Sequence, residues 1–164
     1  MKILDLVDDV RSGCKSVLTT MTLEEYKKLS FFAFNNNGNI DGQRSVIKRS
    51  STAAKIRKRM ADDFRKGAIF PQVVLGVLFS TENMQNLDES KFYMLLESVN
   101  EGQISIIDGM QRSNIYFENY EDNKQQKIRV EFWCSDASTK LLYRMLVLNT
   151  GQVPWNTRRQ LEVI

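Results

Sequence analysis

Residues Ile106 to Ser113 read Ile-Ile-Asp-Gly-Met-Gln-Arg-Ser, and this stretch decides the fold. An apolar strand over residues 103–107 runs into an Asp-Gly turn, and a helical pattern then continues to about Tyr120. Strands that pass into helices along one chain are typical of layered α/β domains. The stretch therefore predicts an α/β (α+β) fold with a strand-to-helix turn at Gly109.

The flanking sequence predicts further strands and helices. Apolar runs, β-branched residues or alternation predict strands over residues 69–79, 91–99 and 127–133. Apolar residues at helical spacing predict helices over residues 3–18, 51–66 and 139–148, and a last helix begins near Pro154. Thr22 and Glu25 form the pattern of a capping box. Because the chain stops inside the last helix, we expect it to be the N-terminal part of a longer protein.

The turn at Gly109 has the chemistry of a phosphate site. Glycine leaves the backbone open to a ligand, and the first N–H groups of the following helix lack intrahelical partners. These groups and the helix dipole favour an anion, and the Arg112 guanidinium adds a charged fork for phosphate oxygens. Asp108 has three possible roles, which are to hold Mg²⁺ or water, to pair with Arg112, or to cap the helix. Gln111 would orient a water or read a base edge; the purely structural alternative is a capped turn with a surface ion pair.

Composition excludes several kinds of chemistry. The chain has no histidine, so a Ser-His-Asp triad, a Cys-His pair and a histidine metal centre are impossible within it. Cys14 and Cys134 lie far apart without metal-ligand spacing, which favours a reducing, cytoplasmic compartment. No run of about 18 apolar residues predicts a membrane span.

Basic residues gather in one part of the chain. Residues 43–67 hold nine Lys and Arg against two Asp, a charge of +7, so the rest carries −4 of the total +3. A local basic face suggests an anionic partner such as DNA, and the alternative is a solvated helix face. The candidate DNA contacts are Lys48, Arg49, Lys55, Arg57, Lys58 and Arg59.

The Asp-Gly-Met-Gln-Arg run after an apolar strand resembles the Asp-Gly-Gln-(His/Gln)-Arg motif of the DGQHR-domain proteins. That group includes the DNA phosphorothioation regulator, and the run also resembles the related restriction-type proteins that hydrolyse nucleotides. Both are similar to the ParB/sulfiredoxin superfamily. Here Met110 replaces the first glutamine of the motif. A second Asp-Gly-Gln-Arg run, residues 41–44, follows a polar loop instead of a strand and is the weaker candidate.

The resemblance implies a ParB/sulfiredoxin-like domain over residues 40–164, with a small mixed sheet flanked by helices and an N-terminal helical extension and loop over residues 1–39. It implies a nucleoside triphosphate, ATP or CTP, with Mg²⁺ held weakly by Asp108. Asp108 and Gln111 would be catalytic. The nucleotide contacts would be Gly109, Met110, Gln111, Arg112 and Ser113, with Arg44, Asn149, Gln152 and Glu162 in support.

The function expected from these observations is a nucleotide-binding, slowly hydrolysing module of DNA modification, restriction or anti-phage defence. DNA, partner subunits or a second copy in a homodimer are the expected partners, and no membrane is expected. One alternative is a DNA-binding regulator without nucleotide chemistry. Another is an interaction domain whose ancestral site is inactive. A sulfiredoxin-like reductase would need a cysteine between residues 108 and 113, and none is present.

Overall fold

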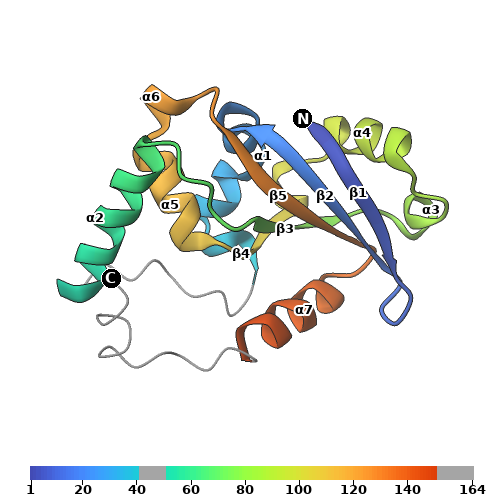
Figure 1. Cartoon of the computed structure of the whole chain (residues 1–164). Helices are drawn as coiled ribbons and strands as arrows, with labels where there is room; N and C mark the ends of the chain where they lie inside the picture. Colours follow the sequence, from blue (N-terminus) through green and yellow to red (C-terminus); the bar gives the residue numbers. More distant parts are fainter. Residues whose placement is uncertain (41–50, 151–164) are drawn as a thin grey trace.

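The computed structural model describes residues 1–40 and 51–150 of the 164-residue chain. They form a mixed α+β domain on one open, five-stranded sheet (Figure 1). In their order across the sheet the strands are β1 (Lys2–Asp9), β2 (Cys14–Thr22), β5 (Lys127–Ser135), β3 (Val73–Leu78) and β4 (Ile104–Asp108). The helices are α1 (Leu23–Asn35), α2 (Ser51–Arg65), α3 (Thr81–Met84), α4 (Glu89–Ser98), α5 (Met110–Glu118), α6 (Tyr120–Asn123) and α7 (Ser138–Thr150). The short 3-10 helices are η1 (Asn37–Asn39) and η2 (Glu101–Gln103).

The sheet is mixed because one of its strand pairs is parallel. β1 and β2 form an antiparallel hairpin, β2 pairs antiparallel with β5, and β3 pairs antiparallel with β4. β3 and β5 run parallel, and their pairing begins with Val73 opposite Val130. The segment before Val73 therefore enters the sheet beside the first residues of β5 without pairing to them.

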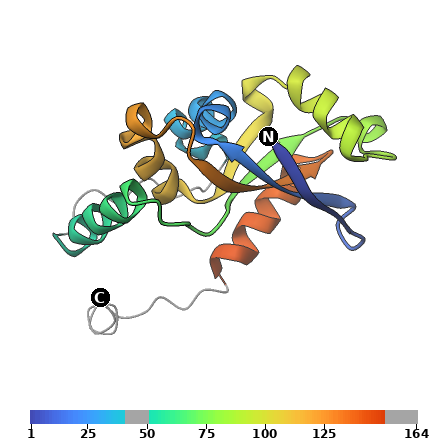
Figure 2. The same ribbon diagram turned by 45° about the horizontal axis from the view of Figure 1, so that its top comes forward.

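Helices cover the two faces of the sheet unequally. Figures 1 and 2 show α7 on one face, with α1, α4 and α5 on the other. On the first face, Leu141 and Met145 of α7 pack against Trp133 and Ile107. The larger core lies on the opposite face and includes Phe132. Phe132 and Trp133, neighbours on β5, therefore point to opposite faces of the sheet.

The N-terminal hairpin corrects the sequence reading. The prediction of a helix over residues 3–18 is wrong, because β1 and β2 occupy these positions. A bulge between Ile3 and Asp5 inserts one residue into β1. Ile3 and Leu6 consequently pair with Thr19 and Val17 and both meet the larger core, three residues apart, as they would on a helix. Residues 1–39, expected as a helical extension outside the domain, supply two strands and α1 to it.

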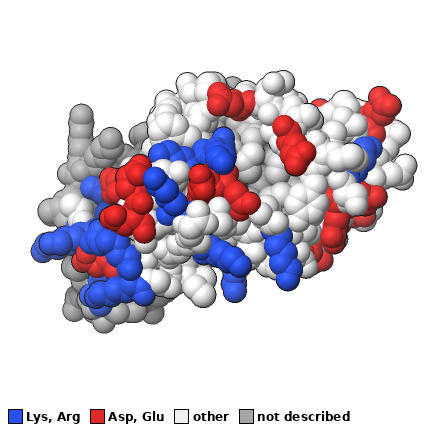
Figure 3. Space-filling model, turned by 90° about the horizontal axis from the view of Figure 1, so that it is seen from above, with Lys and Arg blue, Asp and Glu red and all other residues white. Residues whose placement is uncertain are grey.

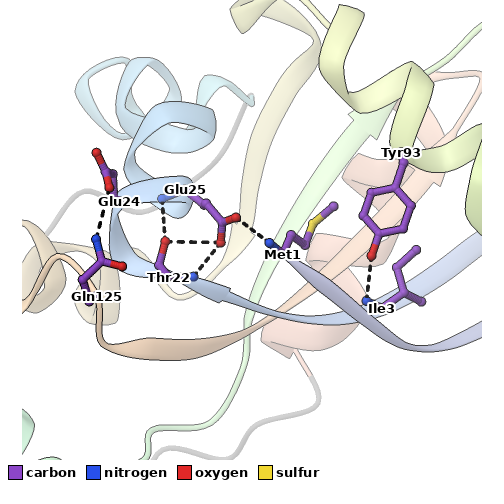
Figure 4. Close-up of polar contacts among 7 residues, drawn as sticks. All are labelled: Met1, Ile3, Thr22, Glu24, Glu25, Tyr93 and Gln125. Carbon is purple, nitrogen blue, oxygen red and sulfur yellow. Dashed lines mark hydrogen bonds and ion pairs between the residues drawn. The ribbon is translucent and has the colours of Figure 1, made fainter.

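Polar contacts fix the start of the chain against α1 and α4 (Figure 4). Thr22 and Glu25 form the expected capping box at the start of α1. The same Glu25 carboxylate pairs with the Met1 ammonium group. The hydroxyl of Tyr93 on α4 accepts a hydrogen bond from the Ile3 amide at 3.1 Å. The Glu25 side chain thus stabilises both the start of α1 and the start of the edge strand β1.

The strand expected over residues 91–99 is also wrong, because α4 occupies this segment. The Asp88 side chain accepts a hydrogen bond from the Lys91 amide and caps the helix. Phe92 and Leu96, four residues apart, are buried in the larger core. The buried apolar residues of this segment therefore line one face of a helix.

The other strands and helices predicted within the described residues are confirmed. Strands occur in the segments predicted at residues 69–79, 103–107 and 127–133, and helices in those predicted at residues 51–66, at residues 139–148 and after Gly109. α2 ends at Arg65 and is closed by Gly67, whose φ is 87°; the amides of Gly67 and Ala68 donate to the carbonyls of Phe64 and Asp63. The last expected helix, beginning near Pro154, lies outside the described residues. Within the two described ranges, every helix is too short or too polar to cross a membrane.

Candidate functional site

The β4–α5 turn is built on a left-handed glycine. Gly109 is the N-cap of α5, with φ 109° and ψ 16°, and it is buried. A Cβ atom at this position would lie 2.6 Å from Cγ1 of Val73 on β3. The side of Gly109 expected to admit a ligand is therefore filled by protein. Glycine is required here by the backbone angle and by packing against β3.

The first turn of α5 has amides but no side-chain cap. In the described ranges no side chain accepts a hydrogen bond from its N-terminal N–H groups, and Gly109 supplies none of its own. The Ser113 amide closes the first intrahelical bond to the Gly109 carbonyl at 2.8 Å. The preceding amides, up to that of Arg112, thus lie in the position where helices bind anions.

Arg112 folds back over the turn. Its Nη2 donates to the Asp108 carboxylate at 2.7 Å and to the Gln72 carbonyl at 3.2 Å. Of the three roles considered for Asp108, the structure shows the ion pair. The Arg112 side chain is 20% exposed and that of Asp108 40%, so the pair sits at the surface of the turn. The buried Arg112 Nε has no acceptor among the described residues.

Ser113 and Met110 contact the interior of the protein. The Ser113 hydroxyl donates to the Gly109 carbonyl at 3.0 Å and lies 2.6 Å from the hydroxyl of Tyr26 on α1. Burial raises the pKa of Tyr26, so this contact is between neutral hydroxyl groups. Met110 packs in the larger core. Neither side chain is placed to meet a ligand, which corrects the expected contact from Ser113 and limits Met110 to its backbone amide. Gln111, in contrast, is partly exposed on the first turn.

The other predicted nucleotide contacts are not brought to the turn by described atoms. Arg44 and Gln152, together with Glu162, lie outside the described residues. Asn149 belongs to the backbone of α7, and its side chain is outside the described set. In the part of the chain that the structure describes, Asp108 belongs to no group of three or more metal-ligating side chains. A magnesium ion at Asp108 would thus need phosphate and water oxygens as its other ligands.

The basic helix α2 lies against α5. The rings of Phe64 on α2 and Tyr116 on α5 have centroids 5.0 Å apart. Arg65 Nη1 donates to the Asn119 side-chain oxygen at 2.8 Å. Lys55, Lys58 and Arg59 are exposed and Arg57 is half-buried, whereas Lys48 and Arg49 lie outside the described residues. Figure 3 shows Lys and Arg atoms gathered over the α2 end of the molecule, with Asp and Glu atoms beside them.

Two residues that contact the turn, and one ring a helical turn away from it, were not predicted from the sequence. Tyr26 lies 87 positions before its partner Ser113, and the Gln72 contact uses a main-chain carbonyl, so neither leaves a local pattern. Tyr116 was detectable, because it stands four residues after Arg112 and therefore on the same face of α5.

Comparisons of this chain with models of known families, with curated proteins and with solved structures found no match.

Proposed function

We propose that this chain is a nucleotide-binding module in which the β4–α5 turn holds phosphate groups, and that it works on or near DNA in modification, restriction or anti-phage defence. The buried Arg112 Nε, which lacks an acceptor beside an uncapped helix start, is the observation that carries the proposal. A buried polar group without a partner costs about 1–3 kcal/mol. A phosphate oxygen at the turn would satisfy this group and the first amides of α5 together. The resemblance of the turn to the DGQHR motif supports the same function.

Asp108 affects the affinity of the turn for phosphate, because its carboxylate accepts a hydrogen bond from Arg112 Nη2. Without a metal this negative charge opposes a phosphate. The same carboxylate would hold Mg²⁺ weakly, and the ion would supply positive charge that favours a phosphate. Gln111, partly exposed on the first turn, would orient a water for slow hydrolysis, in which positioning and electrostatics supply the catalysis.

Isothermal titration with ATP, CTP and GTP tests the site. We expect Arg112→Ala to weaken binding of the preferred nucleotide at least about tenfold, the equivalent of one charged hydrogen bond. The matched control is Arg65→Ala on α2, away from the turn. This variant also removes a guanidinium that is paired with an aspartate, in this case Asp62. Equal losses in the two variants, or no loss in either, would remove the proposed site.

Asp108→Asn separates a binding role of Arg112 from a purely structural one. The substitution keeps the shape of the side chain and removes its charge. We expect tighter nucleotide binding without Mg²⁺ and weaker binding with Mg²⁺, because the carboxylate repels phosphate in the first case and ligates the ion in the second. A turn in which the ion pair serves only folding would show the same change of affinity in both buffers.

A second candidate function, DNA binding without nucleotide chemistry, is favoured by the exposed cations of α2. Lys55 and Lys58 are exposed on this helix. Reversal of both charges to glutamate should weaken DNA retention. It should also reduce the slope of log binding constant against log salt concentration by about two, one for each lost phosphate contact. The control reverses Lys28 on α1, whose side chain is 74% exposed. Retention that survives the double reversal excludes this surface as the DNA contact.

A further inference from the structure

A hollow of about 210 Å³ lies where β3 has not yet begun to pair with β5. One wall is the segment of residues 68–70, and the opposite wall is the start of β5. In the described ranges no backbone hydrogen bond joins residues 68–72 to residues 127–129. The gap between these segments is therefore a break in the sheet with main-chain polar groups at its edge.

Aromatic rings form one side of this hollow. Phe64, Phe70 and Tyr116 all line it. Phe70 and Tyr116 are stacked, with centroids 6.0 Å apart and planes at 23°, and Phe64 lies 5.0 Å from Tyr116. A site lined by aromatic rings with a few polar groups is typical of small-molecule binding. Its volume is below the roughly 300–1,000 Å³ of sites for drug-sized ligands, so it suits one ring system.

The charge of the hollow has one sign. Lys127 and Arg129 line it, both are exposed, and no Asp or Glu is among the lining residues. The ion pairs among the described residues include neither of these cations. The ligand that suits this hollow is therefore a planar ring attached to an anionic group.

The hollow is adjacent to the phosphate turn along two segments. Tyr116 follows Arg112 by one helical turn of α5 and shares its face. Phe70 precedes by two residues Gln72, whose carbonyl binds Arg112 Nη2. The guanidinium and the aromatic wall are thus held by the same helix and the same entry segment.

We infer that this hollow takes the heteroaromatic base of the nucleotide whose phosphates the β4–α5 turn holds, with the half-buried Phe70, backed by the buried Tyr116, as the ring contact and Lys127 and Arg129 at its rim. The inference rests on the proposed function, which it extends from a phosphate site to a nucleotide site.

Ala68→Phe tests the inference by filling the hollow without removing a core side chain. Titrations use ATP, CTP and GTP and, in parallel, inorganic triphosphate, which has no base. We expect the variant to weaken the preferred nucleotide at least about tenfold and to change triphosphate binding by less than about twofold. Ala54→Phe, at an exposed position of α2, is the matched control, and the unfolding midpoint of each variant shows that it folds.

A second variant, Lys127→Ser with Arg129→Ser, leaves the core intact and should weaken the nucleotide more at low salt than at high salt. Nucleotide binding that survives both variants while Arg112→Ala abolishes it overturns the base site and leaves the phosphate site. Binding lost in Ala68→Phe but not in Arg112→Ala overturns the phosphate turn and keeps the hollow. No binding of any nucleotide to the wild-type chain overturns both.

Discussion

Gly109 occupies a position where a side chain meets two separate obstacles. Its φ of 109° is strained for any other residue, and Val73 fills the space of a Cβ atom. We expect Gly109→Ala to lower the free energy of unfolding by about 2–4 kcal/mol, from backbone strain and overpacking together. Urea denaturation of the purified variant measures this loss.

Two other glycines serve as comparisons, because Gly67 shares only the backbone strain of Gly109 and Gly102 shares neither obstacle. At Gly67, φ is 87° but nothing lies within 4 Å of a Cβ atom, so Gly67→Ala should cost only about 1–2 kcal/mol of backbone strain. Gly102 has neither a positive φ nor a near neighbour, and Gly102→Ala should change stability by less than about 0.5 kcal/mol. Equal losses of unfolding free energy in Gly67→Ala and Gly109→Ala would show that the contact with Val73 does not contribute to the cost at Gly109.

At single residues, the sequence predicted the turn better than its surroundings. The Asp-Gly pair after an apolar run located the N-cap of α5, because glycine and the change of periodicity are local signals. The contacts with Val73 and the Gln72 carbonyl come from β3 and its entry segment, more than 30 positions away. Such contacts depend on strand order, which no short pattern encodes.

At the scale of elements, the start of α1 depends on the ionisation of Glu25. Burial alone would raise the pKa of Glu25, but hydrogen bonds from the Met1 ammonium and the Thr22 amide outweigh it and lower the pKa. A lowered pKa gives stability that is present above the ordinary value of 4.5 and is lost as the pH falls below it. We expect Glu25→Gln to cost about 1 kcal/mol at pH 7, and less as the pH approaches 3. Denaturation midpoints across this pH range measure the difference.

Glu24→Gln is the matched control for the helix start. Glu24 is a neighbour on the same turn, and its closest cation, Lys28, is 3.9 Å away at the surface. Its loss should change stability by less than about 0.5 kcal/mol at any pH. A cost for Glu25→Gln that does not vary with pH would contradict the role of its charge.

The packing of α7 on the sheet depends on Gly76 of β3. A Cβ atom there would lie 2.8 Å from Cδ1 of Leu141 and 2.9 Å from Cδ1 of Ile107. We expect Gly76→Ala to cost about 1–3 kcal/mol by overpacking. In the double variant with Leu141→Ala, the total loss should be smaller than the sum of the single losses, because the added methyl enters the space that leucine leaves. Additive losses in thermal denaturation would show that α7 does not rest on Gly76.

Two elements were predicted with the wrong secondary structure for identifiable reasons. In β1 the bulge at Leu4 gives core residues a spacing of three, which imitates a helix. In α4 the run of aromatic and aliphatic residues hides a spacing of four between Phe92 and Leu96. The Asp88 cap was the available signal for this helix.

At the scale of the whole molecule, the order of strands brings the candidate sites together. β4 delivers the phosphate turn and lies beside β3, and the segment that enters β3 forms one wall of the hollow. The parallel pairing of β3 with β5 begins only at Val73 and leaves that hollow open. The mixed α+β class followed from the sequence, but this arrangement did not, because it requires a β3–β5 pairing more than 50 positions apart.

Amide resonances show directly whether the free N–H groups at the start of α5 hold phosphate. A ¹⁵N-labelled chain is titrated with the nucleotide that binds best, and the backbone amide resonances are followed. We expect the largest shifts at the Met110, Gln111 and Arg112 amides, with slower hydrogen exchange at saturation. Resonances of these three amides that stay unmoved at saturating nucleotide would contradict it.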